Sequence, residues 1–513
     1  EQLDLSCAAS GASSVVETGS IDPQIPADSA LTHLSEFDSE FERGQEGRRQ
    51  KAAIALFLVW TTTVLLHLLP GGSVIVWVVA ALMGSHFLRL LIKPQSVQTV
   101  DSREAIALDA TLPYISLLVA AKNEEAVITS LVNELCTLDY PTHRYELWVI
   151  DDHSTDQTPV LLDRLSQKYE NLRVLRRAAD AGGGKSGALN DVWPLTQGDI
   201  IAVFDADAQV PHDLLMRVIP LFEQERVGAV QVRKETVNAS ENIWTQNQSI
   251  EMILDSYLQQ QRIAIGGIGE LRGNGQFVRR AALKQCQGWN EQTITDDLDM
   301  TLRLHLSQWQ IDFLCDPSVG EEGVTTAIAL WHQRSRWAEG GYQRYLDYWR
   351  LLAQNKLGIR KSYDLLMFCL MQYIFPTAAV PDMLMAIVRN RLPIFTPVTS
   401  VTLLFSFASM VIGIRQINRH RLVAQVSSAT GASLGSGHQR SLNLPGDEVP
   451  VLAGFRNVLL PVLQALQGTI YMLHWLPVIA STTLRISIRP KRLKWVKTVH
   501  RGKGDRSLGD EDG

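Results

Sequence analysis

The 513-residue sequence contains few cysteines, and the five that it has are scattered: Cys7, Cys136, Cys286, Cys315 and Cys369. The lack of paired spacing argues against a disulfide framework or a zinc site and is typical of a reducing compartment. Excess charge of one sign is also small, at −6. Because nucleic-acid binding requires a basic surface, we expect no nucleic-acid partner. No apolar segment lies near the first residue, so no secretory signal is expected.

Hydrophobic residues are scarce in the first 50 positions, which are rich in Ser, Ala, Gly and Glu. This composition predicts a disordered N-terminal tail over residues 1–50. The whole chain is too long for one ordinary core. Residues 113–345 have the pattern of a soluble α/β enzyme, whereas apolar runs flank that stretch on both sides.

Two apolar runs, 52–69 and 74–92, are separated by Pro70-Gly71-Gly72. Each run is long enough to cross about 30 Å of hydrocarbon, which predicts a transmembrane hairpin over 51–94. Basic residues lie at both outer ends of the hairpin and none lies in the link. The positive-inside rule therefore places both ends, and the enzyme domain that follows, in the cytoplasm. The alternative is a buried helical hairpin of a soluble protein.

The C-terminal part, 346–484, is predicted to contain membrane and interfacial helices. The first, Tyr363–Val388, carries two internal prolines and is expected to be interrupted; the second is Phe395–Ile414. A polar loop near 425–450 separates them from the apolar stretch 451–484. The tail 485–513 is basic, and a fifth full span would place it outside, against the charge rule. We therefore predict four full spans, an interfacial or re-entrant 451–484, and a basic tail attracted to anionic lipids.

The central domain alternates short β-branched runs with amphipathic stretches, which predicts βαβ units and a mainly parallel sheet. The expected strands are Tyr114–Ala120, Glu146–Asp151, Leu172–Arg176, Ile200–Phe204 and Val227–Val232. Ligands of such sheets bind beyond the carboxyl ends of the strands. The predicted strand ends carry polar clusters, so the site is expected there.

The first two clusters contain Glu124 and the pair Asp151-Asp152. Ser154 or Asp156 would cap a helix starting at Thr158, which explains those two residues. Capping does not explain carboxylates at the very end of an apolar strand. A nucleotide base and its ribose would give them a partner.

Two further motifs point to phosphate chemistry. Gly182-Gly183-Gly184-Lys185 fails the P-loop pattern, since Ala179 stands where the first glycine is required. Because its glycines have no side chains, the backbone N–H groups of this turn can still approach a diphosphate closely. Asp205-Ala206-Asp207 follows a buried strand, and these carboxylates can share a hard divalent cation with phosphate oxygens. An acidic turn is the plainer alternative.

The last motifs are Gly273-Asn274-Gly275, Thr295-Asp296-Asp297 and Gln333-Arg334-Ser335-Arg336-Trp337. The acidic pair could simply occupy the first turn of a helix capped by Thr295. The arginines and the indole could form an aromatic, cationic belt at a membrane surface. Arginine is also well suited to hold a departing pyrophosphate.

The order of these motifs over roughly residues 110–345 resembles family 2 glycosyltransferases, which include cellulose, hyaluronan and poly-N-acetylglucosamine synthases. The resemblance implies a Rossmann-like GT-A domain in the α/β class, flanked by transmembrane helices. It assigns the donor nucleotide sugar to Glu124, Asp152, Lys185 and Asp205. A divalent cation, Mg²⁺ or Mn²⁺, is assigned to Asp207 together with Asp205.

For the transfer itself, the resemblance makes Asp297 the general base, in a Thr-Asp-Asp version of the usual Thr-Glu-Asp motif. Gln333, Arg336 and Trp337 form an intact QxxRW motif, with Arg336 near the diphosphate and Trp337 beneath the acceptor. Inversion at the anomeric carbon is the expected outcome.

Longer runs, such as IAIGGIGELRGNGQF and FDADAQVP, are similar to those of cyanobacterial glucosyltransferases that make a β-glucosyl lipid. This resemblance implies UDP-glucose as donor, diacylglycerol as acceptor, and a plasma or thylakoid membrane of a photosynthetic cell. A processive polysaccharide synthase is the first alternative, and an inactive scaffold or carbohydrate sensor is the second. Each acidic motif is present, which disfavours the inactive protein.

Overall fold

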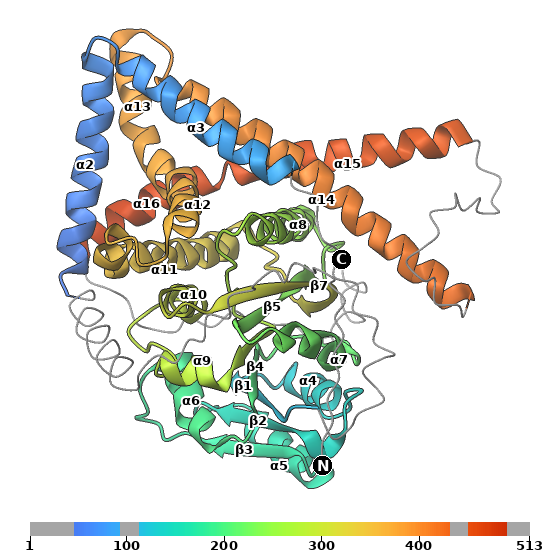
Figure 1. The fold of residues 1–513 in the computed structure, drawn as a ribbon. Coiled ribbons are helices and arrows are strands. Elements are labelled where there is room, and N and C mark those ends of the chain that lie inside the picture. The colour runs from blue at the N-terminus through green and yellow to red at the C-terminus, as the bar shows by residue number, and fades with distance from the viewer. Residues whose placement is uncertain (1–45, 93–111, 431–449, 490–513) are drawn as a thin grey trace, which may run out of the picture.

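The computed structural model describes residues 46–92, 112–430 and 450–489, and a seven-stranded sheet forms the centre of the middle segment (Figure 1). The strand order is β3-β2-β1-β4-β6-β5-β7. β6 runs antiparallel to both of its neighbours and the other pairings are parallel. The strands are β1 (Ile115–Ala121), β2 (Tyr145–Asp151), β3 (Leu172–Arg176), β4 (Ile200–Phe204), β5 (Val227–Thr236), β6 (Gln276–Arg279) and β7 (Gln310–Glu321).

The mainly parallel sheet confirms the α/β prediction, and the five expected strands are present with ends shifted by at most a few residues. β6 and β7 were not predicted. β6 has only four residues, and the polar residues of β7 interrupt its apolar pattern, so neither gives the β-branched run on which the prediction depended.

Helices cover both faces of the sheet, as βαβ units require. One core cluster joins Leu131 and Leu162 to the sheet, and the other joins Leu189 and Met300 to it. The helices are α4 (Ile128–Leu135), α5 (Thr158–Lys168), α6 (Gly184–Val192), α7 (Leu214–Val218), α9 (Arg280–Gln285) and α10 (Asp296–Leu306). Short 3₁₀ turns are η3 (Thr142–Arg144), η4 (Trp193–Leu195) and η5 (Ile219–Glu223).

Two long helices, α8 (Ile243–Ala264) and α11 (Ala327–Ala353), lie between the sheet domain and the apolar helices (Figure 1). Asn242 begins α8 by accepting hydrogen bonds from the backbone of Trp244 and Thr245, in a capping box. α8 packs on β5 and β7 and also on apolar helices, while α11 packs on α10 and on apolar helices. This layer therefore connects the two halves of the molecule.

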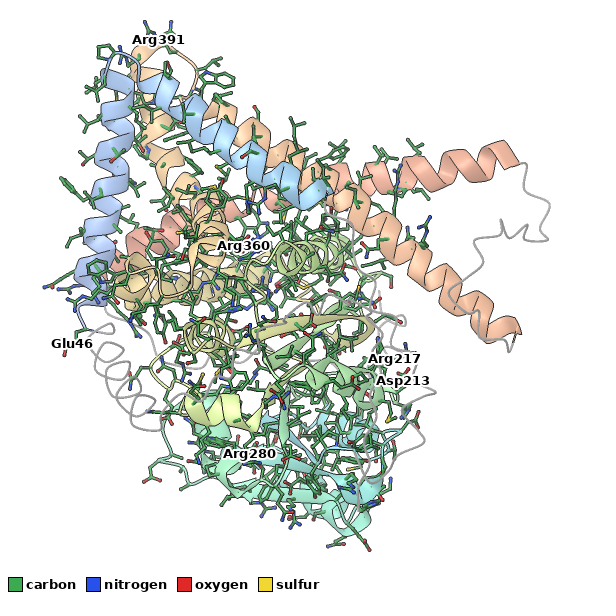
Figure 2. The ribbon with its side chains drawn as sticks, in the orientation of Figure 1. Glu46, Asp213, Arg217, Arg280, Arg360 and Arg391 are labelled. Atoms are coloured by element: carbon green, nitrogen blue, oxygen red, sulfur yellow. The ribbon has the colours of Figure 1, made fainter. Side chains whose placement is uncertain are left out.

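Four helical segments are long and apolar enough to cross a membrane within the described ranges: α2 (Arg48–Leu68), α3 (Gly72–Ile92), Ile359–Arg389 and the part Thr396–Arg419 of α14 (Thr396–Thr430). Their number agrees with the predicted four spans. Figure 2 places Arg360, in the first turn of the third segment, near the α8–α11 layer. Arg391, beyond the last turn of that segment, lies at the top of the view, away from this layer.

The third segment is interrupted, as predicted, but by a π-helical turn. It consists of α12 (Ile359–Cys369), the π turn η6 (Leu370–Ile374) and α13 (Phe375–Arg389). Pro381 lies inside α13. Single π turns in helices are frequent at functional sites.

The stretch predicted to be interfacial forms two helices, α15 (Pro450–Met472) and α16 (Trp475–Ile488). α15 packs on α8 and α14, and α16 packs on α11, α2 and α13. The expected polar loop near 425–450 is partly wrong, since α14 continues to Thr430; residues 431–449 lie outside the described part. Most of the two predicted tails, 1–50 and 485–513, also lies outside it, although α2 begins at Arg48 and α16 ends at Ile488.

Candidate functional site

A single cavity of about 2110 Å³ extends from the carboxyl ends of β1 and β4 to the apolar helices. Pockets for drug-sized ligands usually measure about 300–1,000 Å³, so this one has room for more than a nucleotide sugar. Asp152 does not line it. The other predicted site residues do: Glu124, Lys185, Asp205, Asp207, Asp297, Gln333, Arg336 and Trp337.

The Asp205-Ala206-Asp207 motif lies just beyond β4, where the predicted acidic pair was expected. Lys185, in the first turn of α6, donates from Nζ to Asp205 Oδ1 at 2.5 Å. Burial alone would lower the pKa of Lys185, but the carboxylates of Asp205, Asp296 and Asp297 raise it above its ordinary value. Lys185 is therefore a fixed cation among these carboxylates, which suits it to a diphosphate that binds beside them.

Asp297 lies in the first turn of α10, and its Oδ1 accepts a hydrogen bond from the backbone N–H of Leu298 at 2.8 Å. Burial and the neighbouring Asp296 carboxylate raise the pKa of Asp297 to about 6. Thr295 occupies the N-cap position, yet its side chain makes no capping hydrogen bond. The plain capping interpretation therefore does not explain Thr295, whereas the raised pKa is what a general base needs.

The glycine-asparagine-glycine motif connects the two acidic motifs. Asn274 Oδ1 accepts from the backbone N–H of Asp205 at 3.3 Å. Gly273 has φ +83°, and a Cβ at this position would lie 3.5 Å from Asp297 Oδ2. The motif therefore holds the backbone of Asp205 in place, and the left-handed φ of Gly273, rather than lack of space, favours glycine beside Asp297.

The two arginines of the QxxRW motif on α11 have separate roles. Arg334 is completely buried, and its Nη2 donates to Glu251 Oε2 at 2.5 Å. Tyr471 and Trp475 donate to the same carboxylate, and the Arg334 guanidinium lies 4.1 Å from the centroid of the Trp337 ring. Arg334 therefore anchors α11 to α8, α15 and α16, while Arg336 and Trp337 line the cavity.

Asp152 directly follows β2, as predicted, and its carboxylate pairs with two cations of the protein. Its Oδ1 accepts from Arg177 Nη1 at 2.6 Å and its Oδ2 from Lys122 Nζ at 3.2 Å. Arg177 also donates to Asp191 and to the backbone oxygen of Gly182. The sequence did not single out Arg177, so the partner of this buried carboxylate was missed. Asp152 thus connects the end of β2 to the glycine turn before Lys185.

The neighbouring capping expectations are not met, because Gln157 is the N-cap of α5 and makes no side-chain capping hydrogen bond. Asp156 Oδ1 accepts from the backbone N–H of Thr158, two residues on, in a turn that precedes α5. Ser154 instead accepts from the backbone N–H of Asn123, in the loop after β1.

The acidic pair fits a cation that is shared with a ligand. The described ranges contain no group of three or more His, Cys, Asp or Glu side chains able to hold a metal ion. Mg²⁺ is commonly bound by one or two carboxylates together with substrate phosphates and water. Asp205 and Asp207 both line the cavity and could supply those carboxylates.

Two cavity-lining cations, Lys234 and Arg272, were missed by the sequence analysis. Lys234 Nζ lies 5.5 Å from the centroid of the Trp337 ring. Arg272 pairs with Asp255 and Glu270, and both cations act to lower the pKa of Asp297. Arg272 directly precedes the glycine-asparagine-glycine motif, which was its only signal in the sequence.

Comparison with known proteins identifies the family. Residues 113–340 match the family described as glycosyltransferase like family 2. A β-monoglucosyldiacylglycerol synthase of Trichormus variabilis is 54% identical over 461 residues, 90% of this chain and 91% of the relative. The Synechocystis sp. protein of the same name is 51% identical over 468 residues, 91% of each chain. The chain belongs to this family of glycosyltransferases.

Among solved structures, the mannosyltransferase of Pyrobaculum calidifontis in complex with GDP-Man and Mn²⁺ aligns with 81% of this chain and 99% of its own. The TM-score is 0.49 and the identity 16%. The family match, together with the mixed and mostly parallel sheet, confirms the GT-A domain with flanking apolar helices.

The two arginines should respond differently to truncation. Arg334→Ala leaves the Glu251 carboxylate without its cation, which should destabilise the protein by about 3–5 kcal/mol. Arg336→Ala, two residues along the same helix, should reduce glycosyl transfer with a much smaller change in stability. Thermal unfolding in detergent and transfer assays on both variants measure this. Equal losses of melting temperature would contradict the separation of roles.

Proposed function

We propose that the protein transfers glucose from UDP-glucose to the free hydroxyl of 1,2-diacylglycerol and forms β-monoglucosyldiacylglycerol with inversion. One observation carries this: the glycosyltransferase motifs and the membrane-crossing helices line the same cavity. The names of the relatives in Trichormus and Synechocystis support the same donor sugar and acceptor.

The donor diphosphate would lie between Asp205, Lys185 and Arg336, all of which line the cavity. Lys185 and Arg336 would stabilise the negative charge that develops on UDP as it leaves. A divalent cation, Mg²⁺ or Mn²⁺, held by Asp205 and Asp207 would add positive charge at the same phosphates. Asp152 and Arg177 would hold the glycine turn in place from outside the cavity. Glu124 would contact the nucleoside part of the donor.

Asp297 would act as the general base. The acceptor O–H gives its proton to the Asp297 carboxylate while the oxygen bonds to the anomeric carbon. The bond between that carbon and the β-phosphate oxygen breaks, and UDP departs from the opposite face. A single displacement converts the α linkage of the donor into a β linkage. Trp337 would form the floor under the acceptor, with Gln333 beside it.

The competing function is a processive polysaccharide synthase with the same donor site. A growing glycan is polar throughout and would need a polar channel. The membrane side of this cavity is instead lined by residues such as Phe375, Met383 and Phe405. A lipid acceptor fits these apolar side chains better than a glycan does, although hydroxyls of α14 also line this side.

The place of action follows from the same geometry. Both outer ends of the α2–α3 hairpin are basic, so the catalytic domain would face the cytoplasm. The membrane would be the plasma or thylakoid membrane of a photosynthetic cell. The basic residues near the C-terminus would favour a surface of anionic lipids.

The product tests the proposal directly. Purified protein in detergent with radiolabelled UDP-glucose and dioleoylglycerol should give one chloroform-soluble product that carries a single β-linked hexose. Panels of other UDP-sugars define the donor. Polymer that stays at the chromatographic origin would reject the lipid acceptor, and absence of UDP release with every donor would indicate a binding protein without activity.

Replacement of the base should separate binding from transfer. Asp297→Asn removes the proton acceptor but keeps the size of the side chain, so transfer should fall by about 10²–10⁴-fold. UDP-glucose binding, measured by calorimetry, should stay near the wild-type value because the donor contacts are intact. Transfer at the wild-type rate in this variant would exclude Asp297 as the base.

The pH profile should report the same group. The base works when it is ionised, and its pKa is raised to about 6. The rate should therefore be constant above about pH 7 and fall tenfold for each unit below about pH 5. Asp296→Asn removes a negative neighbour that raises this pKa, so its acid limb should move to lower pH. If the pH midpoint of this fall in rate is unchanged in Asp296→Asn, a group other than Asp297 causes it.

A further inference from the structure

The cavity has a second arm that the sugar donor and the catalytic motifs do not use. This apolar arm lies between the η6–α13 segment and α14, and its walls include Met371, Phe375, Ala379, Val398, Leu403 and Phe405. Most side chains on this side are hydrocarbon or aromatic, and the polar ones are chiefly the hydroxyls of α14 with Gln372 and Asp382. The arm near the sheet instead carries most of the carboxylates and cations. The apolar walls offer few partners to the charged and polar groups of a nucleotide sugar.

Contacts within the protein hold the walls of the apolar arm in place. Phe405 of α14 stacks on Phe87 of α3, with ring centroids 4.0 Å apart and planes 8° from parallel. At the far end, the buried Asp382 accepts hydrogen bonds from His67 and from the backbone N–H groups of Ile394 and Phe395. This carboxylate fixes the turn between α13 and α14, so the arm is closed by a defined structure at that end.

The apolar arm is open to the side. Met383 on α13 and Thr399 and Ser400 on α14 line the cavity and are also exposed at the surface. Both helices belong to the membrane-crossing set. A molecule dissolved in the bilayer can therefore reach the cavity between them without passing through water.

A polar group without a protein partner lies in the same cavity. Gln372, in the π turn η6, lines the cavity, and its buried Oε1 has no hydrogen-bond partner among the described residues. An amide that turns about its last bond can accept from a hydroxyl or donate to a carbonyl. Because Gln372 lines the cavity, a ligand that binds there can supply the missing hydrogen-bond partner.

We propose that the apolar arm binds the two acyl chains of the acceptor lipid, which enters between α13 and α14, and that Gln372 binds its glycerol ester region. The assignment rests on the proposed function and extends it to the mode of acceptor binding. The chains lie among hydrocarbon walls, the esters meet the amide, and the free hydroxyl reaches Asp297 at the junction with the polar arm. The acceptor thus moves laterally from the bilayer, between α13 and α14, to the base Asp297.

The test fills the apolar arm and compares chain lengths. Ala379→Trp projects an indole into the arm, while Val380→Trp places one on the neighbouring residue, which does not line the cavity. The ratio of kcat/KM for dioleoylglycerol to that for dioctanoylglycerol should fall about tenfold in Ala379→Trp, since lost burial of one or two methylene groups has this effect. The ratio should stay unchanged in Val380→Trp.

A second pair repeats the comparison on α14. Leu403→Trp should lower the same ratio, and Leu404→Trp, on an exposed neighbour outside the cavity lining, should not. Because the ratio is taken within one preparation, the fraction of folded enzyme cancels. An unchanged ratio in both cavity variants, or an equal change in the exposed controls, overturns the assignment.

Gln372→Met separates the ester contact from the chain contacts. KM should rise about equally for both chain lengths, so the ratio should keep its wild-type value while UDP-glucose affinity is unaffected. An unchanged KM would remove Gln372 from the acceptor site.

Photo-crosslinking gives a readout that does not require turnover. A diacylglycerol with a diazirine in its acyl chain should label peptides from α13 and α14, and unlabelled dioleoylglycerol should compete. Labelling that does not compete rejects the apolar arm as the site. If wild-type enzyme forms no glucolipid at all, the proposed function fails; if it does and the ratios do not move, only this inference fails.

Discussion

One buried carboxylate, that of Glu270, connects the sheet domain to the apolar helices. It is 1% exposed and pairs with Arg272 at 2.6 Å, Arg344 at 3.1 Å and Arg262 at 3.3 Å. Burial by itself would raise the pKa of Glu270, but the three guanidinium groups hold it well below its usual range. The arginines come from α8, α11 and the loop before β6, and Arg262 continues to Asp364 of α12. Buried charges tolerate little displacement, because removal of one partner leaves the other without compensation. The cluster therefore fixes how the helices lie on the sheet.

The position of the base depends on this cluster. Arg272 is followed by Gly273, whose backbone passes beside Asp297, and by Asn274, which holds the backbone of Asp205. Movement of α8 or α11 relative to the sheet would shift Arg272 and with it the donor and acceptor sides of the site. The distance between the site and the apolar helices is thus set by ion pairs within the protein. An acceptor held in a bilayer would need this constancy, since its hydroxyl could reach only a limited distance.

The strands and the order of motifs were predictable because both depend on local patterns. β1, β2 and β4 are mostly buried apolar runs, and the motifs that contain Glu124, Asp152 and Asp205 follow them directly. The partners of charged residues were not predictable in the same way. Arg177 and Asp152 are 25 residues apart, and Arg262 and Asp364 are 102 apart, with no pattern that links them. The different contacts of Arg334 and Arg336 could not be predicted either. Arg334 is buried because of residues that are distant in the sequence, namely Glu251, Tyr471 and Trp475. β6 was missed because a four-residue strand pairs through its neighbours and has almost no periodicity of its own.

Exclusion of water by a bound acceptor would connect acceptor choice to base strength. A carboxylate in water has a pKa near 4 and is a weak base for a lipid hydroxyl. Asp297 is half-buried at the cavity wall beside Asp296, and its pKa is raised to about 6. Water that filled an open cleft would solvate both carboxylates and reduce this shift. A lipid that occupies the apolar arm excludes water from the same cavity, so the bound acceptor itself helps to keep the base strong at the moment when its own proton must be removed. A polar glycan would bring water with it and lose this advantage.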